Sequence, residues 1–341
     1  MILDGASGEA IDTCAAALRA GELVALPTET VYGLAADADN TSAVAMIFAA
    51  KGRPSDHPLI VHVDDAQQGA AGVAHFATGV PAFAQQLMLA FWPGPLTLIL
   101  RRRTGAGAAA AGGQDSIGLR CPAHPVAQAL LHACRALGVM GLAAPSANPF
   151  GRVSPTTAAH VLSEFGATLL VLDGGACTVG IESTIIDCTR GAPVLLRPGA
   201  ITPAQVQAVC GLRVLSQGEA LALRATAPRA SGTLEAHYAP KARLRLMDAR
   251  ALQTALDLLG HDVNAPVPMI ATYARTVLHS GAQGVLRRRM PDDAASTAQQ
   301  LFAVLREFDA CGVKLIWVET PPDTPDWDGV RDRLQRASSA A

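Results

Sequence analysis

Apolar and polar residues follow two periods along this chain, and together they predict both helices and strands. Residues 8–20 place apolar side chains on one helical face and follow Ser7, a good capping residue. Short apolar runs such as Leu59 to Val63 are typical of buried strands. The same signals predict helices over residues 42–50, 85–91, 125–136, 156–165 and 202–209, and strands over 22–26, 96–101, 141–144, 168–172, 183–187 and 194–197. This mixture indicates an α/β fold.

The pattern changes after residue 212 and divides the chain into three parts. Residues 1–212 form the α/β domain, and residues 213–242 lack clear periodicity and contain several Pro and Gly, so they are expected to be a linker. Residues 243–341 predict strands over 244–247, 267–271 and 315–319, and helices over 251–259 and 294–309. This alternation predicts a small Rossmann-like α/β domain. Residues 106–113 are low in complexity and are expected to form a flexible loop.

Composition narrows the class of protein. The 341 residues are 50% hydrophobic, enough for a large core, and the net charge of -2 gives no reason to expect tight nucleic-acid binding. No apolar stretch reaches a clean membrane-spanning length. The seven cysteines are scattered and contain no Cys-x-x-Cys pair, which argues against a disulfide framework and a protein-bound metal. A cytoplasmic location without membrane contact is expected.

Four polar segments lie between the predicted strands. They are residues 27–33, 51–54, 116–122 and 144–155. Lys51 and Arg53 can clamp anionic oxygens, although an exposed basic loop is the alternative. Arg120 sits in an apolar strand and needs an anionic partner if buried, either a ligand carboxylate or one of the chain's own acids. His62 lies in another apolar strand, where a hydrogen-bonded core histidine is the more common case.

Taken in order, these segments resemble the YrdC-type threonylcarbamoyl-adenylate synthases. The matching stretches are PTETVYG at 27, KGRP at 51, PLIVHV at 58, FWPGPLT at 91, GLRCP at 118, PSAN at 145, IESTIID at 181 and LRPG at 196. HYAPK at 237 resembles the linker of the long, two-domain members. The resemblance implies a YrdC-like twisted mixed sheet, with helices forming a concave site.

The resemblance also implies which residues meet the substrates. The residues implied for an L-threonine pocket are Thr30, His62, Arg120, Ala144 and Ser183. Those implied for ATP are Arg53, His57, Ser116, Ser146, Asn148, Ser154, Arg197 and Tyr238, with Lys51 and Arg53 as the catalytic pair. The family usually has Asn where this chain has His57, so an amide is replaced by a ring whose charge depends on pH.

The implied reaction joins L-threonine, bicarbonate or carbon dioxide, and ATP into threonylcarbamoyl-AMP and pyrophosphate. The product would serve threonylcarbamoyl (t6A) modification of the adenosine next to the tRNA anticodon. Catalysis would rest on positioning and on charge stabilisation by Lys51, Arg53 and Arg197. Mg²⁺ would arrive with ATP and sit mainly on phosphate oxygens and water.

Two further expectations concern the surroundings of this site. The linker is expected to fold over it, with Tyr238 reaching the nucleotide, because closure would protect a labile carbamate from water. The product would be handed to the tRNA-modifying transferase complex, and a weak contact with tRNA itself is left open.

Two other functions compete with this reading. An RNA-binding protein could use the same concave surface without ATP turnover, but residues 1–212 hold 11 Lys and Arg against 15 Asp and Glu. A carbamoyl-transfer protein of hydrogenase maturation contains a similar domain, but it would also carry Cys-rich zinc modules, and no such cysteine pattern is present. The adenylate-forming enzyme is therefore favoured.

Overall fold

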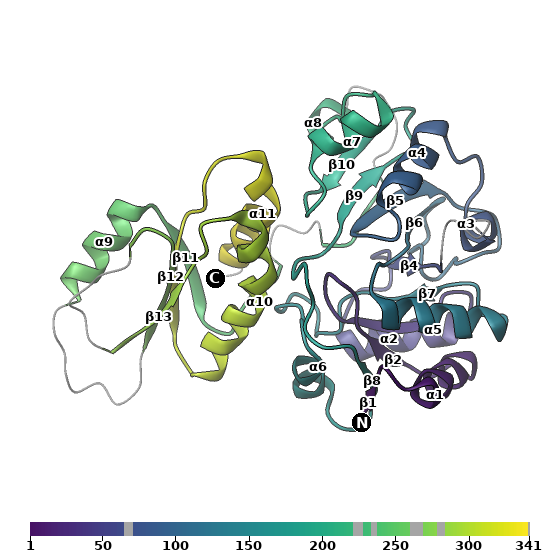
Figure 1. Ribbon diagram of the computed structural model, residues 1–341, viewed down its shortest axis with the longest axis horizontal. Coiled ribbons are helices and arrows are strands. Elements are labelled where there is room, and N and C mark those ends of the chain that lie inside the picture. The colour runs from purple at the N-terminus through teal and green to yellow at the C-terminus, as the bar shows by residue number, and fades with distance from the viewer. Residues whose placement is uncertain (65–70, 221–227, 233–236, 260–268, 278–283, 340–341) are drawn as a thin grey trace. The chain divides into compact units, whose positions relative to one another are not determined.

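A computed structural model describes residues 1–64, 71–220, 228–232, 237–259, 269–277 and 284–339. The chain forms two compact units: the first combines Met1–Phe150 with Ser154–Thr233, and the second combines Gly151–Val153 with Leu234–Ala341 (Figure 1). The expected linker over 213–242 is thus divided between the units, and its residues 221–227 and 233–236 lie outside the described part. The first unit holds every candidate site residue except Tyr238.

The described residues of the first unit build a ten-stranded mixed sheet in the order β1-β8-β2-β3-β7-β4-β6-β5-β9-β10. The strands are β1 (Ile2–Asp4), β2 (Val24–Leu26), β3 (Gly33–Asp37), β4 (Ile60–His62), β5 (Leu96–Arg101), β6 (Ser116–Arg120), β7 (Leu142–Ala143), β8 (Leu170–Asp173), β9 (Thr184–Asp187) and β10 (Val194–Arg197). The helices are α1 (Gly8–Arg19), α2 (Thr41–Lys51), α3 (Ala71–Phe76), α4 (Ala82–Phe91), α5 (Pro125–Ala136), α6 (Ala158–Phe165), α7 (Pro203–Cys210) and α8 (Gln217–Ala220). The predicted twisted mixed α/β architecture is confirmed.

Two hydrophobic clusters cover the two faces of this sheet. Successive residues of a strand point to opposite faces. In β2, Val24 and Leu26 therefore pack with α1 and α5, while Ala25 packs with the larger cluster that includes α2 and α4. The apolar strands are buried on both sides, which explains why they read as short continuous apolar runs.

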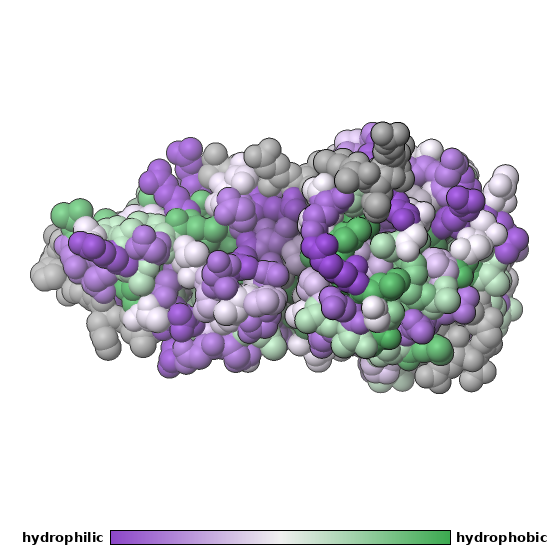
Figure 2. All heavy atoms as spheres, turned by 90° about the horizontal axis from the view of Figure 1, so that it is seen from above, coloured by the Kyte–Doolittle hydropathy of each residue, from purple (hydrophilic) through white to green (hydrophobic). Residues whose placement is uncertain are grey.

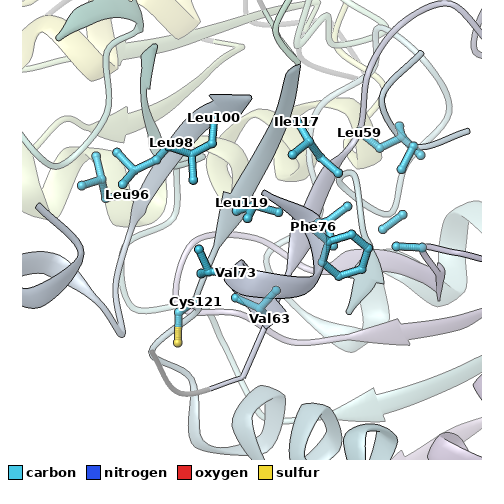
Figure 3. Packing of buried hydrophobic residues seen from close by; sticks show 14 of the residues in the cluster. Leu59, Val63, Val73, Phe76, Leu96, Leu98, Leu100, Ile117, Leu119 and Cys121 are labelled. Atoms are coloured by element: carbon cyan, nitrogen blue, oxygen red, sulfur yellow. The ribbon is translucent and has the colours of Figure 1, made fainter. Parts of the chain in front are cut away.

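The larger cluster lies under β4, β5 and β6, which carry much of the candidate site. The side chains drawn in Figure 3 include Leu96, Leu98 and Leu100 of β5 and Ile117 and Leu119 of β6. Because these residues face the core, their neighbours along each strand, such as Thr97, Gly118 and Arg120, face the other side of the sheet. The core therefore fixes the surface on which the polar side chains are presented.

Local signals define the ends of several helices. In α7, Thr202 and Gln205 form a reciprocal capping box, as expected from the predicted start of this helix. Helix α2 begins after the cap Asn40 and ends at Gly52, which adopts the left-handed conformation with φ of 62°. This turn places Lys51 in the last turn of the helix and Arg53 directly beyond it.

The low-complexity stretch 106–113 is packed against the rest of the unit. Ala110 is fully buried, and its carbonyl accepts a hydrogen bond from the Leu59 amide at 2.7 Å. Gly112 has a φ of 59°, and a Cβ there would lie 2.6 Å from the carbonyl oxygen of Asp56. The prediction of a flexible loop was wrong, because small residues here permit close backbone contact.

The second unit is a four-stranded parallel sheet in the order β11-β14-β12-β13. Its elements are β11 (Arg243–Met247), α9 (Ala249–Leu258), β12 (Ile270–Ala274), β13 (Val285–Arg289), α10 (Ala294–Ala310), β14 (Leu315–Glu319), a short 3-10 turn (Pro325–Trp327) and α11 (Asp328–Ser338). The Rossmann-like α/β prediction is confirmed. Strand β13 was not predicted from the sequence, because only its first two residues are apolar and the other three are arginines.

Among the described residues, no helix is both long and apolar enough to cross a membrane. On the face drawn in Figure 2, hydrophobic residues form patches interspersed with hydrophilic ones on both units. The most exposed large hydrophobic side chains include Leu89 and Leu258. Isolated exposures of this kind are ordinary for a folded protein.

Candidate active site

Several polar residues of the first unit lie side by side at adjacent ends of neighbouring strands. Strands β4 and β6 run parallel, and their register pairs His62 with Arg120. Strand β5 is antiparallel to β6, and its register sets Thr97 beside Arg120. Ser183 immediately precedes β9, and its hydroxyl lies 2.8 Å from that of Thr97. We call this row, with Thr30 and Ala144 beside it, the Arg120 end of the site.

All three guanidinium nitrogens of the buried Arg120 donate hydrogen bonds. Nε donates to the Gly94 carbonyl at 3.2 Å, Nη1 to the Thr30 hydroxyl at 2.9 Å, and Nη2 to Glu29 Oε1 at 2.6 Å. The second Glu29 oxygen accepts from the Ala123 amide at 3.1 Å. The partner of Arg120 within the chain is therefore one of its own acids.

The hydroxyls of Thr28 and Thr30 lie 2.8 Å apart, and either can be the donor of that contact. Thr28 Oγ1 also donates to the Val31 carbonyl at 2.6 Å and accepts from the Thr30 and Val31 amides, each at 3.2 Å. The Thr30 hydroxyl in turn accepts from Arg120, so this turn holds the threonine and the arginine together.

His62 is fully enclosed yet lacks a hydrogen bond at Nδ1. Burial lowers the pKa of His62 well below its ordinary value, and the adjacent positive charge of Arg120 lowers it further. The ring is therefore neutral at pH 7. A buried polar atom without a partner is costly, and this one marks a place for a ligand group. The interpretation of His62 as a hydrogen-bonded core histidine does not hold.

Ser183 connects the Arg120 end with Arg197. Arg197 donates from Nε and Nη2 to the Ser183 carbonyl at 3.0 and 2.9 Å, and from Nη2 to the Ser183 hydroxyl at 3.1 Å. Ala144 is buried, and its amide donates to the Ile60 carbonyl of β4 at 3.0 Å. All five residues expected to line a threonine pocket therefore lie on neighbouring strand ends.

Lys51 holds the loop that follows β7. Its ammonium donates to the Ser146 carbonyl at 2.5 Å and also to the Asn148 carbonyl. Burial lowers the pKa of Lys51 well below its ordinary value, and the positive charge of Arg53 lowers it further. Two of the three donors of an ammonium are thus used on the loop. Lys51 positions Ser146 and Asn148 and keeps one donor for a ligand.

Arg53, just beyond α2, lies among polar and aromatic groups. Its Nη2 donates to the Pro58 carbonyl at 2.9 Å and to the Ser231 hydroxyl at 3.3 Å, and its guanidinium lies 5.5 Å from the centre of the Phe150 ring. His57 meets the same ring edge-on, at 5.5 Å between centres. Burial and then the charge of Arg53 lower the pKa of His57, so at neutral pH it is uncharged, as an Asn would be.

Ser116 lies at the opposite end of β6 from Arg120. Ser116, Gly118 and Arg120 share one face of the strand, so the two ends are separated by about 13 Å at the usual rise per residue. Between them, side-chain atoms of Ile99, Thr97 and Ile60 lie 3.2 to 3.7 Å from where a Cβ of Gly118 would be. The residues lining a pocket at the Ser116 end are Pro58, Leu59, Ile60, Ile99, Gln114, Ser116, Gly118, Ile185, Arg229, Ala230 and Ser231.

Residues 229–231, from the expected linker, cover this pocket. The Arg229 amide donates to Gln114 Oε1 at 2.6 Å, and the Ser231 hydroxyl donates to the Pro58 carbonyl at 2.7 Å. Arg197 Nη1 donates to the Ser231 carbonyl at 3.0 Å. The space left beneath the segment is about 10 Å³, the room of about one water molecule. We call this region, with Arg53, Ser116 and Arg197, the Arg53 end of the site.

A buried acid lies near Lys51. The Ser154 hydroxyl donates to Glu182 Oε1 at 2.5 Å, and both residues are buried. The negative charges of Glu164 and Glu182 oppose the lowering of the Lys51 pKa. Among the described residues, no group of three His, Cys, Asp or Glu side chains is arranged to hold a metal ion.

Tyr238 belongs to the second unit. Its ring stacks on Phe302, with 5.5 Å between centres, and the Arg333 guanidinium lies 5.3 Å from the ring centre. Tyr238 has a φ of 61°, unusual for a residue other than glycine. The expectation that it contacts the nucleotide stays a prediction, as does closure of the site by the whole linker.

Three residues that contact candidate site residues were not assigned a role from the sequence. They are Thr97, Glu182 and Ser231, which contact Ser183, Ser154 and Arg53 respectively. Glu29 lies in the polar segment 27–33 that the sequence singled out, and it contacts Arg120. Nothing in the local pattern marks Ser231, because its contacts depend on the course of the chain around it.

Family models match both parts of the chain. Residues 16–199 match the Sua5/YciO/YrdC family, described as "Telomere recombination". Residues 201–339 match a family described as "Threonylcarbamoyl-AMP synthase, C-terminal domain".

Named relatives agree with these matches. Threonylcarbamoyl-AMP synthase of Bacillus subtilis is 38% identical, over 96% of this chain and 92% of the relative. A putative threonylcarbamoyl-AMP synthase of Mycobacterium tuberculosis is 37% identical over 59% of this chain and 88% of its own, shorter length. The crystal structure of Pyrococcus abyssi Sua5 complexed with L-threonine has a TM-score of 0.83 and 33% identity, covering 97% of this chain and 94% of that one. The chain therefore belongs to the Sua5/YciO/YrdC family, in the two-domain form of its threonylcarbamoyl-AMP synthases.

Proposed function

We propose that the protein makes threonylcarbamoyl-AMP and pyrophosphate from L-threonine, bicarbonate and ATP. The observation that carries this proposal is the continuity of the two ends of the site. Arg120 and His62, whose Nδ1 has no hydrogen bond, lie at one end, Ser183 joins this end to Arg197, and Ser231 links Arg197 to Arg53. The two arginines suit an anion. The P. abyssi Sua5 structure, crystallised with L-threonine, supports the choice of amino acid.

The chemistry has two steps, and both balance without a protein nucleophile. The threonine ammonium and bicarbonate give an N-carboxylate, releasing one water and one proton as the nitrogen–carbon bond forms. A carboxylate oxygen of this carbamate then attacks the α-phosphorus of ATP, and the bond to the β-phosphate bridging oxygen breaks to release pyrophosphate. The residues need only bring the reactants together and stabilise the phosphate charge.

The Arg53 end would hold the nucleotide. Arg53 and Arg197 would stabilise phosphate charge, and Lys51 would act mainly by fixing the loop of Ser146 and Asn148. Residues 229–231 occupy donors of both arginines, so nucleotide entry would displace Ser231. Mg²⁺ would enter as part of the ATP complex, where it neutralises phosphate charge.

The proposal also covers the protein that receives the product and the cellular compartment of the reaction. Threonylcarbamoyl-AMP would pass to the transferase that modifies the tRNA adenosine next to the anticodon. None of the seven cysteines, all of which the structure describes, forms a disulfide, and five of them are buried. Free thiols are typical of reducing compartments, which supports a cytoplasmic location.

The direct test is pyrophosphate release from the purified chain with threonine, bicarbonate and ATP, each omitted in turn. Release should depend on all three, and the adenylate should be identified by mass. Pyrophosphate released at the same rate without threonine would overturn the proposal. Binding of RNA with strong salt dependence and no ATP turnover would favour the competing RNA-binding function.

A further inference from the structure

Glu29 is a buried acid for which the proposed chemistry has no use. It pairs with Arg120 at 2.6 Å, and the side chains of the two residues are 8% and 4% exposed. Its two oxygens accept one hydrogen bond each from the chain, from Arg120 and from the Ala123 amide. A carboxylate has about four acceptor positions, so each oxygen can accept one more hydrogen bond.

The charges at this end of the site are balanced as a pair. Arg120 contributes one positive charge and Glu29 one negative charge, while His62 beside them is neutral. A ligand with only a carboxylate would leave an excess negative charge in a buried place, and a ligand with only an ammonium would leave an excess positive one. A zwitterion adds no net charge, so this pair suits an amino acid better than either of its halves.

The donors and acceptors are divided in the same way. Arg120 can only donate, so it suits the carboxylate of the ligand. Glu29 can only accept, and each of its oxygens has an acceptor position left. An ammonium can only donate, and it therefore suits Glu29.

We propose that Glu29 is a specificity-determining residue that binds the α-ammonium of the substrate, so that the Glu29–Arg120 pair selects a zwitterionic amino acid. This inference rests on the proposed function, because it takes the Arg120 end as the amino-acid subsite. It adds a role for Glu29 beyond that of holding Arg120 in place.

The test compares wild type with Glu29→Gln for two ligands, L-threonine and (R)-3-hydroxybutanoate, which is threonine without its amine. Dissociation constants are measured by titration calorimetry and by competition in the pyrophosphate assay. Wild type should bind threonine about 10- to 100-fold more tightly than 3-hydroxybutanoate, the value of a charge-assisted contact. Glu29→Gln should weaken threonine by a similar factor and bind 3-hydroxybutanoate as tightly as wild type or more tightly, because Arg120 is then uncompensated.

A structural role would give a different result. If Glu29 only holds Arg120, the variant should weaken both ligands by the same factor, and that outcome overturns the proposal. Glu29→Asp keeps the charge and should preserve the preference for threonine. If Glu29→Gln does not fold, the two ligands are compared in wild type only, and equal binding of the two ligands there also overturns the proposal. Threonine-dependent pyrophosphate release in wild type tests the proposed function separately.

Discussion

At the scale of single residues, the unpartnered nitrogen of His62 predicts rejection of L-valine. Valine fills the space of threonine but has a methyl group in place of the hydroxyl, so it would leave the buried ring nitrogen unsatisfied. The cost of about 1–3 kcal/mol corresponds to roughly five- to more than a hundredfold in kcat/KM. Pyrophosphate release with each amino acid measures this ratio. His62→Ala should reduce it, whereas equal rates in wild type would contradict the assignment.

Lys51 and Arg53 are two residues apart but should respond differently to removal. Arg53→Ala loses a contact to phosphate worth about 1.5–3 kcal/mol, so adenylate formation should fall roughly ten- to more than a hundredfold. Lys51→Ala should slow the reaction as severely and also lower the melting temperature, because two buried carbonyls lose their donor. Kinetics and thermal unfolding of both variants give the answer, with Arg101→Ala, an exposed arginine, as the control. Near wild-type turnover in both would show that the triphosphate lies elsewhere.

The lowered pKa of His62 makes stability depend on pH. The unfolded chain protonates this ring near pH 6.5, but the folded chain does so only at a much lower pH. The folded state is therefore fully favoured above the ordinary His pKa and loses stability as pH falls below it, by up to about 1.4 kcal/mol per pH unit. In urea unfolding between pH 7.5 and 5, wild type should lose more stability than His62→Gln as the pH falls. Parallel curves would mean that His62 titrates normally.

At the scale of elements, the proposed function requires the nucleotide to bind where residues 229–231 contact Arg53 and Arg197. Ser231→Asp would place a carboxylate between Arg53 and Arg197, so the KM for ATP should rise at least about tenfold while the KM for threonine stays near wild type. Steady-state kinetics for each substrate separate the two. Arg213→Ala is the control, because its ion pair with Glu219 is exposed, lies outside the pocket lining and is worth only about 0–1 kcal/mol. An unchanged KM for ATP in Ser231→Asp would place the phosphates away from these arginines.

Helices and most strands followed from local rules, and the failures have physical reasons. Apolar runs and caps such as Thr202 act over a few residues, so they are visible in the sequence. Strand β3 (Gly33–Asp37) is made largely of small residues and was not predicted, although all of its residues are buried. Residues 106–113 were predicted to be flexible because composition alone does not show that Ala110 packs against a distant strand.

At the scale of the whole molecule, the role of the segments beyond residue 211 can be tested by removal. The M. tuberculosis relative is shorter and matches 59% of this chain over 88% of its own length. A chain truncated after Gly211 and the variant Tyr238→Ala should both lose the adenylate to hydrolysis several times faster than the full chain, since closure keeps water out. Adenylate yield and lifetime are followed by chromatography. Equal yields and lifetimes would show that the segment 213–242 only joins the two units and does not protect the adenylate.

The sequence by itself determined the α/β class and the order of motifs, because strand periods, caps and short motifs are local properties. The site residues that its motifs imply through the family resemblance stay predictions. Only the tertiary structure decided what these residues contact. Arg120 pairs with Glu29 across 91 residues, and Lys51 reaches the Ser146 carbonyl across 95. Buried charges take partners according to the packing of distant strands, which no local pattern records. The same packing leaves His62 without a hydrogen bond at Nδ1 and sets Ser231 between two arginines.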